Sequence, residues 1–153
     1  MPALDKYALP LLVGLIFGSA LHAQNSTTAG EFTAEPPTLV SLGFEWRITG
    51  DDNRNATVAV QYRKAGESQW REALPLLRIG DEKVWRAREF LEYWTPRMFA
   101  GSILDLEPDT PYEARFVLSD PDGIGGPASA ATKTVTVRTR PEPKQTPRST
   151  QAW

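Results

Sequence analysis

Apolar and polar residues alternate with a period of two along much of this chain. In residues 42–48, LGFEWRI, large apolar side chains are separated by single small or polar residues. Such a segment places its apolar side chains on one face of a strand and its polar side chains on the other. The pattern recurs in 58–62, 104–106, 112–118 and 135–137, and turn-forming residues separate these segments. Short alternating strands with frequent turns predict an all-β antiparallel sandwich.

Residues 1–23 differ in character from this alternating part. Lys6 precedes an apolar run over residues 7–21, and small residues surround its end, which is the layout of a secretory signal peptide. The run is shorter than the roughly 20 residues needed to cross a bilayer. We therefore expect cleavage after Ala20 or Ala23 and a secreted protein, extracellular or periplasmic, with no membrane attachment after cleavage.

Both flanks of the central part have the composition of linkers. Residues 24–34 are polar, and residues 142–153 are rich in proline and polar side chains without apolar periodicity. We therefore expect one domain over residues 35–141, which is within the size that a single core can stabilise. The C-terminal linker composition indicates either a fragment or the first module of a longer protein.

Charge and composition exclude several classes of function. The chain has 17 Lys and Arg against 19 Asp and Glu, intermixed, so no basic stripe predicts nucleic-acid binding. It has no cysteine, and its one histidine, His22, lies in the predicted signal peptide. The mature chain then lacks the usual general base and nearly all zinc arrangements. We expect no catalytic residues and no cofactor. The remote alternative is a carboxylate-dependent hydrolase using Glu89 and Glu92.

The segment 104–118, LDLEPDTPYEARFVL, contains a break between two alternating stretches. Leu106 ends one predicted strand, Pro108 lies in a segment that crosses between the sheets, and Tyr112 begins the next strand. The ring of Tyr112 is predicted to face the core, with its hydroxyl bonded to backbone groups of the crossing segment. This arrangement is the tyrosine corner of immunoglobulin-like sandwiches.

This motif and three further segments resemble the strand signatures of a fibronectin type III domain. The three segments are FEWRI around Trp46, VAVQYRKAG around Tyr62 and TKTVTVRTRP. The resemblance covers about residues 35–141 and implies an immunoglobulin-like antiparallel β-sandwich of fibronectin type III topology. It implies a monomeric, non-catalytic spacer or a module that recognises proteins or glycans. Such modules often precede carbohydrate-active or phosphatase domains of the same polypeptide. The implied structural residues are Trp46, Tyr62, Leu106, Pro108 and Tyr112.

Residues 72–101 form a longer connection than the resemblance implies, so we expect an insertion between the middle strands. Residues 81–93 are compatible with a short helix that ends before Pro96, which makes the predicted insertion partly helical. Its aromatic residues either pack over a sheet edge or form a binding face for a protein or polysaccharide. An alternative function is a stand-alone carbohydrate-binding protein. The candidate binding residues are Trp70, Trp85, Tyr93 and Trp94.

The resemblance also implies that two acidic turns, GDDNRN and SDPDGIGG, leave the same end of the sandwich. Asp51 and Asp52 lie in the first, and Asp120 and Asp122 lie in the second. These carboxylates are candidate ligands for a hard cation such as calcium, which prefers six to eight oxygens. The alternative is that Asp, Asn, Pro and Gly are present because turns need them.

Overall fold

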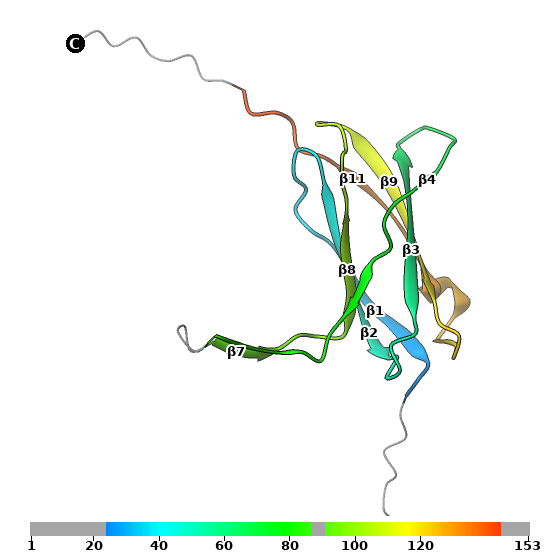
Figure 1. The fold of residues 1–153 in the computed structure, drawn as a ribbon. Helices are drawn as coiled ribbons and strands as arrows, with labels where there is room; N and C mark the ends of the chain where they lie inside the picture. Colours follow the sequence, from blue (N-terminus) through cyan, green and yellow to red (C-terminus); the bar gives the residue numbers. More distant parts are fainter. Residues whose placement is uncertain (1–23, 87–90, 145–153) are drawn as a thin grey trace, which may run out of the picture.

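The computed structural model describes residues 24–86 and 91–144, which form a β-sandwich with a projecting hairpin (Figure 1). The five-stranded sheet has the order β10 (Ile124–Gly125), β1 (Thr27–Ala34), β2 (Leu42–Gly50), β8 (Met98–Ile103) and β5 (Leu77–Ile79). The four-stranded sheet has the order β11 (Thr132–Arg138), β9 (Pro111–Ser119), β3 (Thr57–Lys64) and β4 (Arg71–Glu72). The hairpin pairs β6 (Lys83–Arg86) with β7 (Leu91–Trp94), and Ala128–Ala131 forms a short 3-10 helix, η2.

The predicted all-β character and antiparallel pairing are confirmed, with the short β1–β10 contact as a parallel exception. The strongest alternation in the sequence, in β2 and β9, forms the core. Phe44 and Phe116 have ring centroids 4.6 Å apart across it, and Trp46 meets Phe32 edge to face at 5.6 Å. Each such side chain contributes about 1.5–3 kcal/mol on burial. The buried apolar residues are Leu42, Phe44, Trp46, Ile48, Ala56, Val58, Val60, Leu76, Phe99, Ile103, Leu106, Tyr112, Ala114, Phe116 and Leu118.

Tyr112 lies where the chain crosses from the five-stranded sheet to the four-stranded sheet. It is only 3% exposed, and its hydroxyl accepts a hydrogen bond of 3.0 Å from the backbone N–H of Glu107. The buried Thr139 donates its hydroxyl to the Glu107 carbonyl at 2.6 Å and accepts the Thr110 N–H at 3.0 Å. The ring and hydroxyl of Tyr112 therefore lie as the sequence predicts, and they satisfy backbone groups of the crossing segment.

The other residues predicted to be structural lie in the core or beside this crossing. Trp46 is fully buried, and Leu106 is buried below the crossing segment. Tyr62 is half-buried, with its ring centroid 6.2 Å from that of Tyr112. Pro108 is half-buried within the crossing segment itself.

The N-terminal polar segment belongs to the sandwich. The predicted linker over residues 24–34 is wrong from Thr27 onward, because β1 pairs with β2 and Phe32 packs against the core. Thr27 is fully buried, and its hydroxyl donates to Asp120 at 2.5 Å. A register shift between Ala29 and Phe32 interrupts the alternation, so the strand has a weak signature in the sequence.

The insertion predicted over residues 72–101 is β-structure and is shorter than predicted. A helix over residues 81–93 is wrong where the structure describes them, because β6 and β7 pair as an antiparallel hairpin; residues 87–90 lie outside the described residues. Cross-strand pairs of β-branched and aromatic side chains favour strands over helix. Residues 98–101 belong to β8 and pair with β2, so they are part of the sandwich.

The predicted strand over residues 104–106 is also wrong. The preceding strand β8 ends at Ile103, and Asp105 adopts a φ of 57°, which an extended strand does not permit. Leu104 is exposed and Leu106 is buried, although an extended strand would place both side chains on one face, so the bend at Asp105 interrupts the alternation.

Most of the two chain ends lies outside the described residues. The predicted signal peptide with its cleavage sites, residues 1–23, and residues 145–153 of the C-terminal linker lie outside the described residues. Residues 141–144 follow β11 without regular secondary structure. Within residues 24–86 and 91–144, no helix has the length and apolar content required to span a membrane.

Replacing Tyr112 by phenylalanine keeps the ring and leaves the Glu107 N–H without its acceptor. We expect Tyr112→Phe to lower the free energy of unfolding by about 1–3 kcal/mol, measured by urea denaturation. Tyr93→Phe is the matched control, because Tyr93 is exposed in the hairpin, and it should change stability by less than about 0.5 kcal/mol. Equal losses in the two variants would contradict the role of the Tyr112 hydroxyl.

Candidate functional site

The hairpin of β6 and β7 carries three exposed aromatic side chains. Its register places Lys83 opposite Trp94 and Trp85 opposite Glu92. Because directly paired residues point to the same face and neighbours along a strand alternate, Trp85 and Trp94 share one face and Tyr93 lies on the other. The side chains of Trp85, Trp94 and Tyr93 are 66%, 65% and 46% exposed. The hairpin therefore presents two indoles to solvent on one face.

Lys83 and Glu92 lie on the same face as the two indoles. Their Nζ and Oε1 atoms are 2.5 Å apart, so the two charges neutralise each other. The described part of this face is therefore broad, aromatic and without net charge. Such a face suits a ligand that stacks on rings and exchanges a few hydrogen bonds. It does not attract a ligand by long-range charge.

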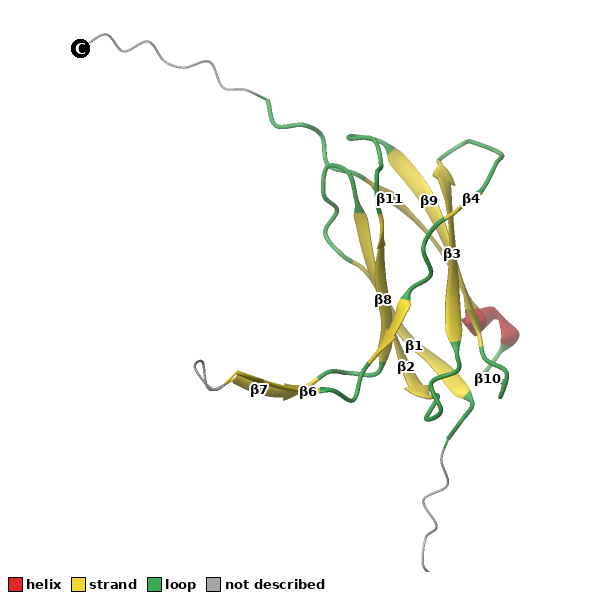
Figure 2. Ribbon diagram, viewed as in Figure 1, coloured by secondary structure: helices red, strands yellow, loops and turns green. Residues whose placement is uncertain are grey.

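The hairpin stands apart from both main sheets (Figure 2). Its two strands pair only with each other among the described residues, and they project from one end of the sandwich. A two-stranded hairpin alone is at best marginally stable in water. Its orientation must therefore depend on its base, where residues 80–82 join β5 to β6 and residues 95–97 join β7 to β8.

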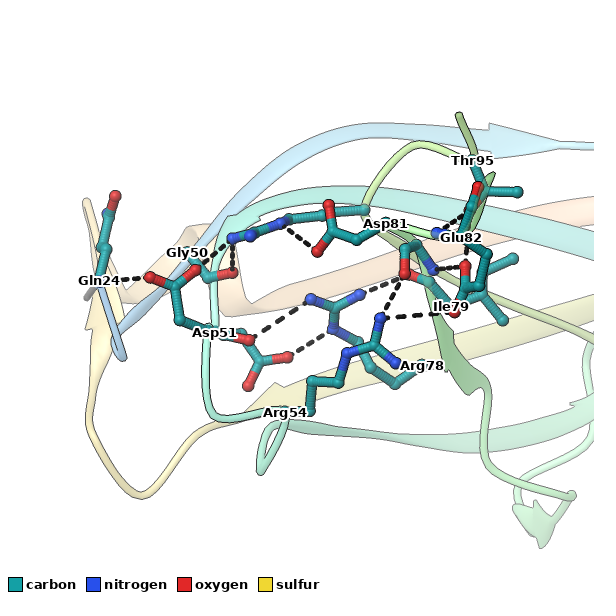
Figure 3. Close-up of polar contacts among 12 residues, drawn as sticks. Gln24, Gly50, Asp51, Arg54, Arg78, Ile79, Asp81, Glu82 and Thr95 are labelled. Atoms are coloured by element: carbon teal, nitrogen blue, oxygen red, sulfur yellow. Dashed lines mark hydrogen bonds and ion pairs between the residues drawn. The ribbon is translucent and has the colours of Figure 1, made fainter. Parts of the chain in front are cut away.

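A buried ion pair between Asp51 and Arg78 lies at the centre of this base (Figure 3). The Asp51 side chain is fully buried and that of Arg78 is 9% exposed, with 2.5 Å between Arg78 Nε and Asp51 Oδ2. The second carboxylate oxygen accepts the N–H of Ala56 at 3.1 Å. Removing a charge from water costs several kcal/mol, so neither partner is tolerated here without the other.

Arg97 lies in the segment that connects β7 to β8, and it holds this segment against the same end of the sandwich. Its Nε lies 2.8 Å from the carboxylate of Asp81, and its Nη1 lies 2.5 Å from Asp52 and 3.0 Å from the Gly50 carbonyl. The hydrogen bond from Arg97 lowers the pKa of Asp52 below its ordinary value, and the Gln24 N–H at 2.7 Å adds to this effect. The Arg97 guanidinium thus links the end of β2 to the two segments, 80–82 and 95–97, that connect the hairpin to the sandwich.

Glu82 organises the outer part of the base (Figure 3). Its carboxylate accepts the Thr95 hydroxyl at 2.6 Å and the Gly80 N–H at 2.8 Å, and it lies 3.4 Å from Arg54. The Thr95 bond is the main reason that the pKa of Glu82 lies below its ordinary value. Gly80 has a φ of 131°, and a Cβ there would lie 2.6 Å from Arg97 Cα, so glycine is required.

The arginines of the base are not found by sequence reasoning. Arg54, Arg78 and Arg97 are three of many charged residues, and their partners Gly80, Asp51, Asp52, Asp81 and Gly50 lie 16 to 47 positions away in the chain. The only usable signal is position, since Arg78 and Arg97 flank the aromatic segment on its two sides.

The two acidic turns lie together at the end of the sandwich, as the sequence predicts. Asp122 accepts hydrogen bonds from Asn53 at 2.7 Å and Asn55 at 2.8 Å, which join the β2–β3 loop to the β9–β10 loop. These two bonds lower the pKa of Asp122, with the Asn53 bond contributing most. The turns are therefore held together by carboxylate–amide pairs.

The four candidate calcium ligands do not form one site. Asp51 and Asp52 bind arginines, and Asp120 accepts the hydroxyl of a buried threonine and the N–H of Asp122. Among the residues that the structure describes, no group of three or more His, Cys, Asp or Glu side chains is arranged to hold a metal ion. Protein donors thus already occupy these four carboxylates.

Trp70 is separate from the other three candidate binding residues. It precedes β4 and its ring packs against two guanidinium groups, with Arg63 at 4.4 Å and Arg115 at 4.6 Å from the ring centroid. Such cation–π contacts hold a half-buried indole against the outer face of the four-stranded sheet. The structure thus brings Trp85, Tyr93 and Trp94 together on the hairpin and gives Trp70 a packing role elsewhere.

The candidate acid–base residues are in part beyond the described chain. Of the two candidate carboxylates, Glu89 falls outside the described residues and Glu92 pairs with Lys83 on the exposed face of the hairpin; His22 also falls outside the described residues. A solvated, ion-paired carboxylate has no environment that adapts it to acid–base catalysis.

The comparisons with known proteins add no identification. No protein-family model matches the chain, and no curated protein matches it either.

Breaking the buried ion pair tests the importance of the base. Asp51→Asn leaves Arg78 as an uncompensated buried charge, and we expect it to lower the free energy of unfolding by about 3–5 kcal/mol. Asp109→Asn is the matched control, since Asp109 and Arg138 form an exposed pair and both aspartates have positive φ, which asparagine tolerates. The control should lose less than about 1 kcal/mol in urea denaturation. Losses of the same size would show that burial of the pair is unimportant.

The ionic contacts that hold the foot of the hairpin, at residues 80–82 and 95–97, should also weaken at low pH. Asp52 and Glu82 have pKa values lowered from 3.8 and 4.5, so their stabilising contribution is complete above these values and is lost as pH falls through the lower folded values. We expect the indole NMR resonances of Trp85 and Trp94 to broaden or shift between about pH 5 and pH 2. Asp52→Asn with Glu82→Gln should remove this transition. A transition that persists unchanged in the double variant would place its origin elsewhere.

Proposed function

We propose that the chain is a secreted, non-catalytic module of the fibronectin type III kind that recognises a protein or a polysaccharide through the β6–β7 hairpin. The strand signatures and the buried Tyr112 hydroxyl bond support the kinship. The observation that carries the function is the pair of indoles, Trp85 and Trp94, exposed on one face of a hairpin whose base is fixed by buried and bridging arginines. Large exposed apolar groups in a fixed arrangement are typical of interaction sites.

The position of the hairpin suits a module that holds a ligand away from a neighbouring domain. Residues 141–144 leave the sandwich at the end opposite to the hairpin (Figure 1). The exit is fixed by the N–H of Arg140, which donates to the Thr38 carbonyl at 2.8 Å, and by its carbonyl, which accepts the Asp109 N–H at 3.1 Å. A catalytic domain that followed this exit would therefore have the recognition surface at the far end of a rigid spacer.

The second candidate is a stand-alone carbohydrate-binding protein. Sugar rings stack on indoles through their C–H faces, and the neighbouring Lys83 and Glu92 supply a donor and an acceptor for hydroxyl groups. The neutral character of this face favours a neutral polysaccharide over an acidic one.

Binding to a panel of neutral polysaccharides, measured by glycan array and affinity electrophoresis, tests both candidates. We expect Trp85→Ala and Trp94→Ala each to weaken binding by about tenfold or more, because a stacked aromatic anchor contributes about 1–3 kcal/mol. Both side chains are exposed, so urea denaturation should show little change in stability.

Val117→Ala is the control, since Val117 is exposed on the outer face of the four-stranded sheet, away from the hairpin. Binding that is equally weak in this variant, or unaffected by both tryptophan substitutions, would exclude the hairpin as the recognition surface. Two results together would instead support a protein partner. They are the absence of glycan binding and protection of Trp85 and Trp94 from solvent in the full-length polypeptide.

A further inference from the structure

Gln24, the first residue that the structure describes, is bound to the loop after β2 (Figure 3). Its backbone N–H donates to the Asp52 carboxylate at 2.7 Å, and its carbonyl accepts the Asp52 N–H at 3.2 Å. Its Cγ lies over Gly50, 3.3 Å from the position that a Cβ on that glycine would take. The chain is therefore anchored to the sandwich from the residue directly after Ala23, which is one of the two expected cleavage positions.

The carboxylates at this end of the sandwich outnumber the cations among the described residues. Arg97 contacts Oδ1 of Asp52, and the other oxygen, Oδ2, faces the Gln24 nitrogen. The surplus of negative charge favours a further cation beside Asp52. The three arginines at this end are Arg54, Arg78 and Arg97, and the six carboxylates are those of Asp51, Asp52, Asp81, Glu82, Asp120 and Asp122.

Cleavage after Ala23 would supply such a cation. It would convert the amide nitrogen of Gln24 into an α-ammonium group at hydrogen-bond distance from Oδ2 of Asp52. An ion pair would then add to the hydrogen bond that is already present. Cleavage after Ala20 would instead leave a neutral amide at this position, with three more residues before it.

We propose that Gln24 is the N-terminal residue of the mature protein and that Asp52 binds its α-ammonium group. The ammonium begins a row of alternating charges, continued by Asp52, Arg97 and Asp81, that reaches the base of the hairpin. Removal of residues 1–23 thus completes the ionic contacts at this end of the sandwich. The inference rests on the secretion in the proposed function, but it does not depend on what the hairpin binds.

The reactivity of Gln24 reports this contact. An N-terminal glutamine cyclises to pyroglutamate when its neutral α-amine attacks the side-chain carbonyl carbon, Cδ. The N–Cδ bond forms, the Cδ–Nε2 bond breaks, and ammonia leaves with one proton from the amine. A neighbouring carboxylate favours the protonated amine, which has no lone pair for the attack. The contact with Asp52 should therefore slow the cyclisation.

The first measurement locates the N-terminus. The full chain is secreted from a bacterial host, and the product is identified by intact mass and by sequencing of its N-terminal peptide. We expect a mature protein that begins at Gln24. A product that begins at Leu21 would overturn this inference and leave the secretion intact. A product that keeps residues 1–23 would overturn both.

The second measurement follows the loss of ammonia from the folded protein at neutral pH by mass spectrometry. We expect Asp52→Asn to cyclise at least about threefold faster than the unaltered protein, because the ion pair is lost. Asp81→Asn is the matched control, since it removes another partner of Arg97 without touching Gln24, and asparagine tolerates the positive φ of Asp81. It should cyclise at the unaltered rate.

Concentrated urea provides a further control, because the contact between Gln24 and Asp52 requires the fold. The three proteins should cyclise at one common rate in urea. Equal rates for Asp52→Asn and the unaltered protein in the folded state would overturn the proposal, as would an increase in Asp81→Asn that equals the one in Asp52→Asn.

Discussion

The ion pair between Asp51 and Arg78 is the contact on which the position of the hairpin depends. It joins the turn after β2 to β5, the edge strand that leads directly into the hairpin. Arg78 points inward to this pair, and the neighbouring Leu77 is exposed. Because neighbouring side chains along a strand alternate, a shift of one residue would bury the leucine and expose the arginine. The pair therefore fixes the register of β5.

Much of the sandwich is predictable because its signals are local. The alternation in β2, β3, β9 and β11 appears within single segments, and the position of Tyr112 follows from the break just before it. The strand β1 is missed because a register shift after Ala29 and its small side chains weaken the alternation. The hairpin is predicted as a helix because its sequence mixes good helix formers with aromatic residues, and local propensity does not settle such a case.

The candidate site is only partly predictable for a different reason. Trp85, Tyr93 and Trp94 are close in sequence and remain close in space, whereas Trp70 lies on another sheet between Arg63 and Arg115. The base of the hairpin depends on pairs of residues far apart in the chain, and one sequence does not show which arginine meets which carboxylate. Turn residues such as Asp51 are recognised by composition, but their roles as buried ion-pair partners come only from the fold.

The two short connections at the base have a consequence for how such a protein can change. Gly80 and Arg97 belong to the sandwich end, whereas the strands β6 and β7 contact almost nothing else that the structure describes. The tip can therefore be lengthened, shortened or exchanged without disturbing the core below it. Different hairpins can therefore be grafted onto the same sandwich, so selection and protein engineering can both alter the projecting surface while the scaffold stays constant.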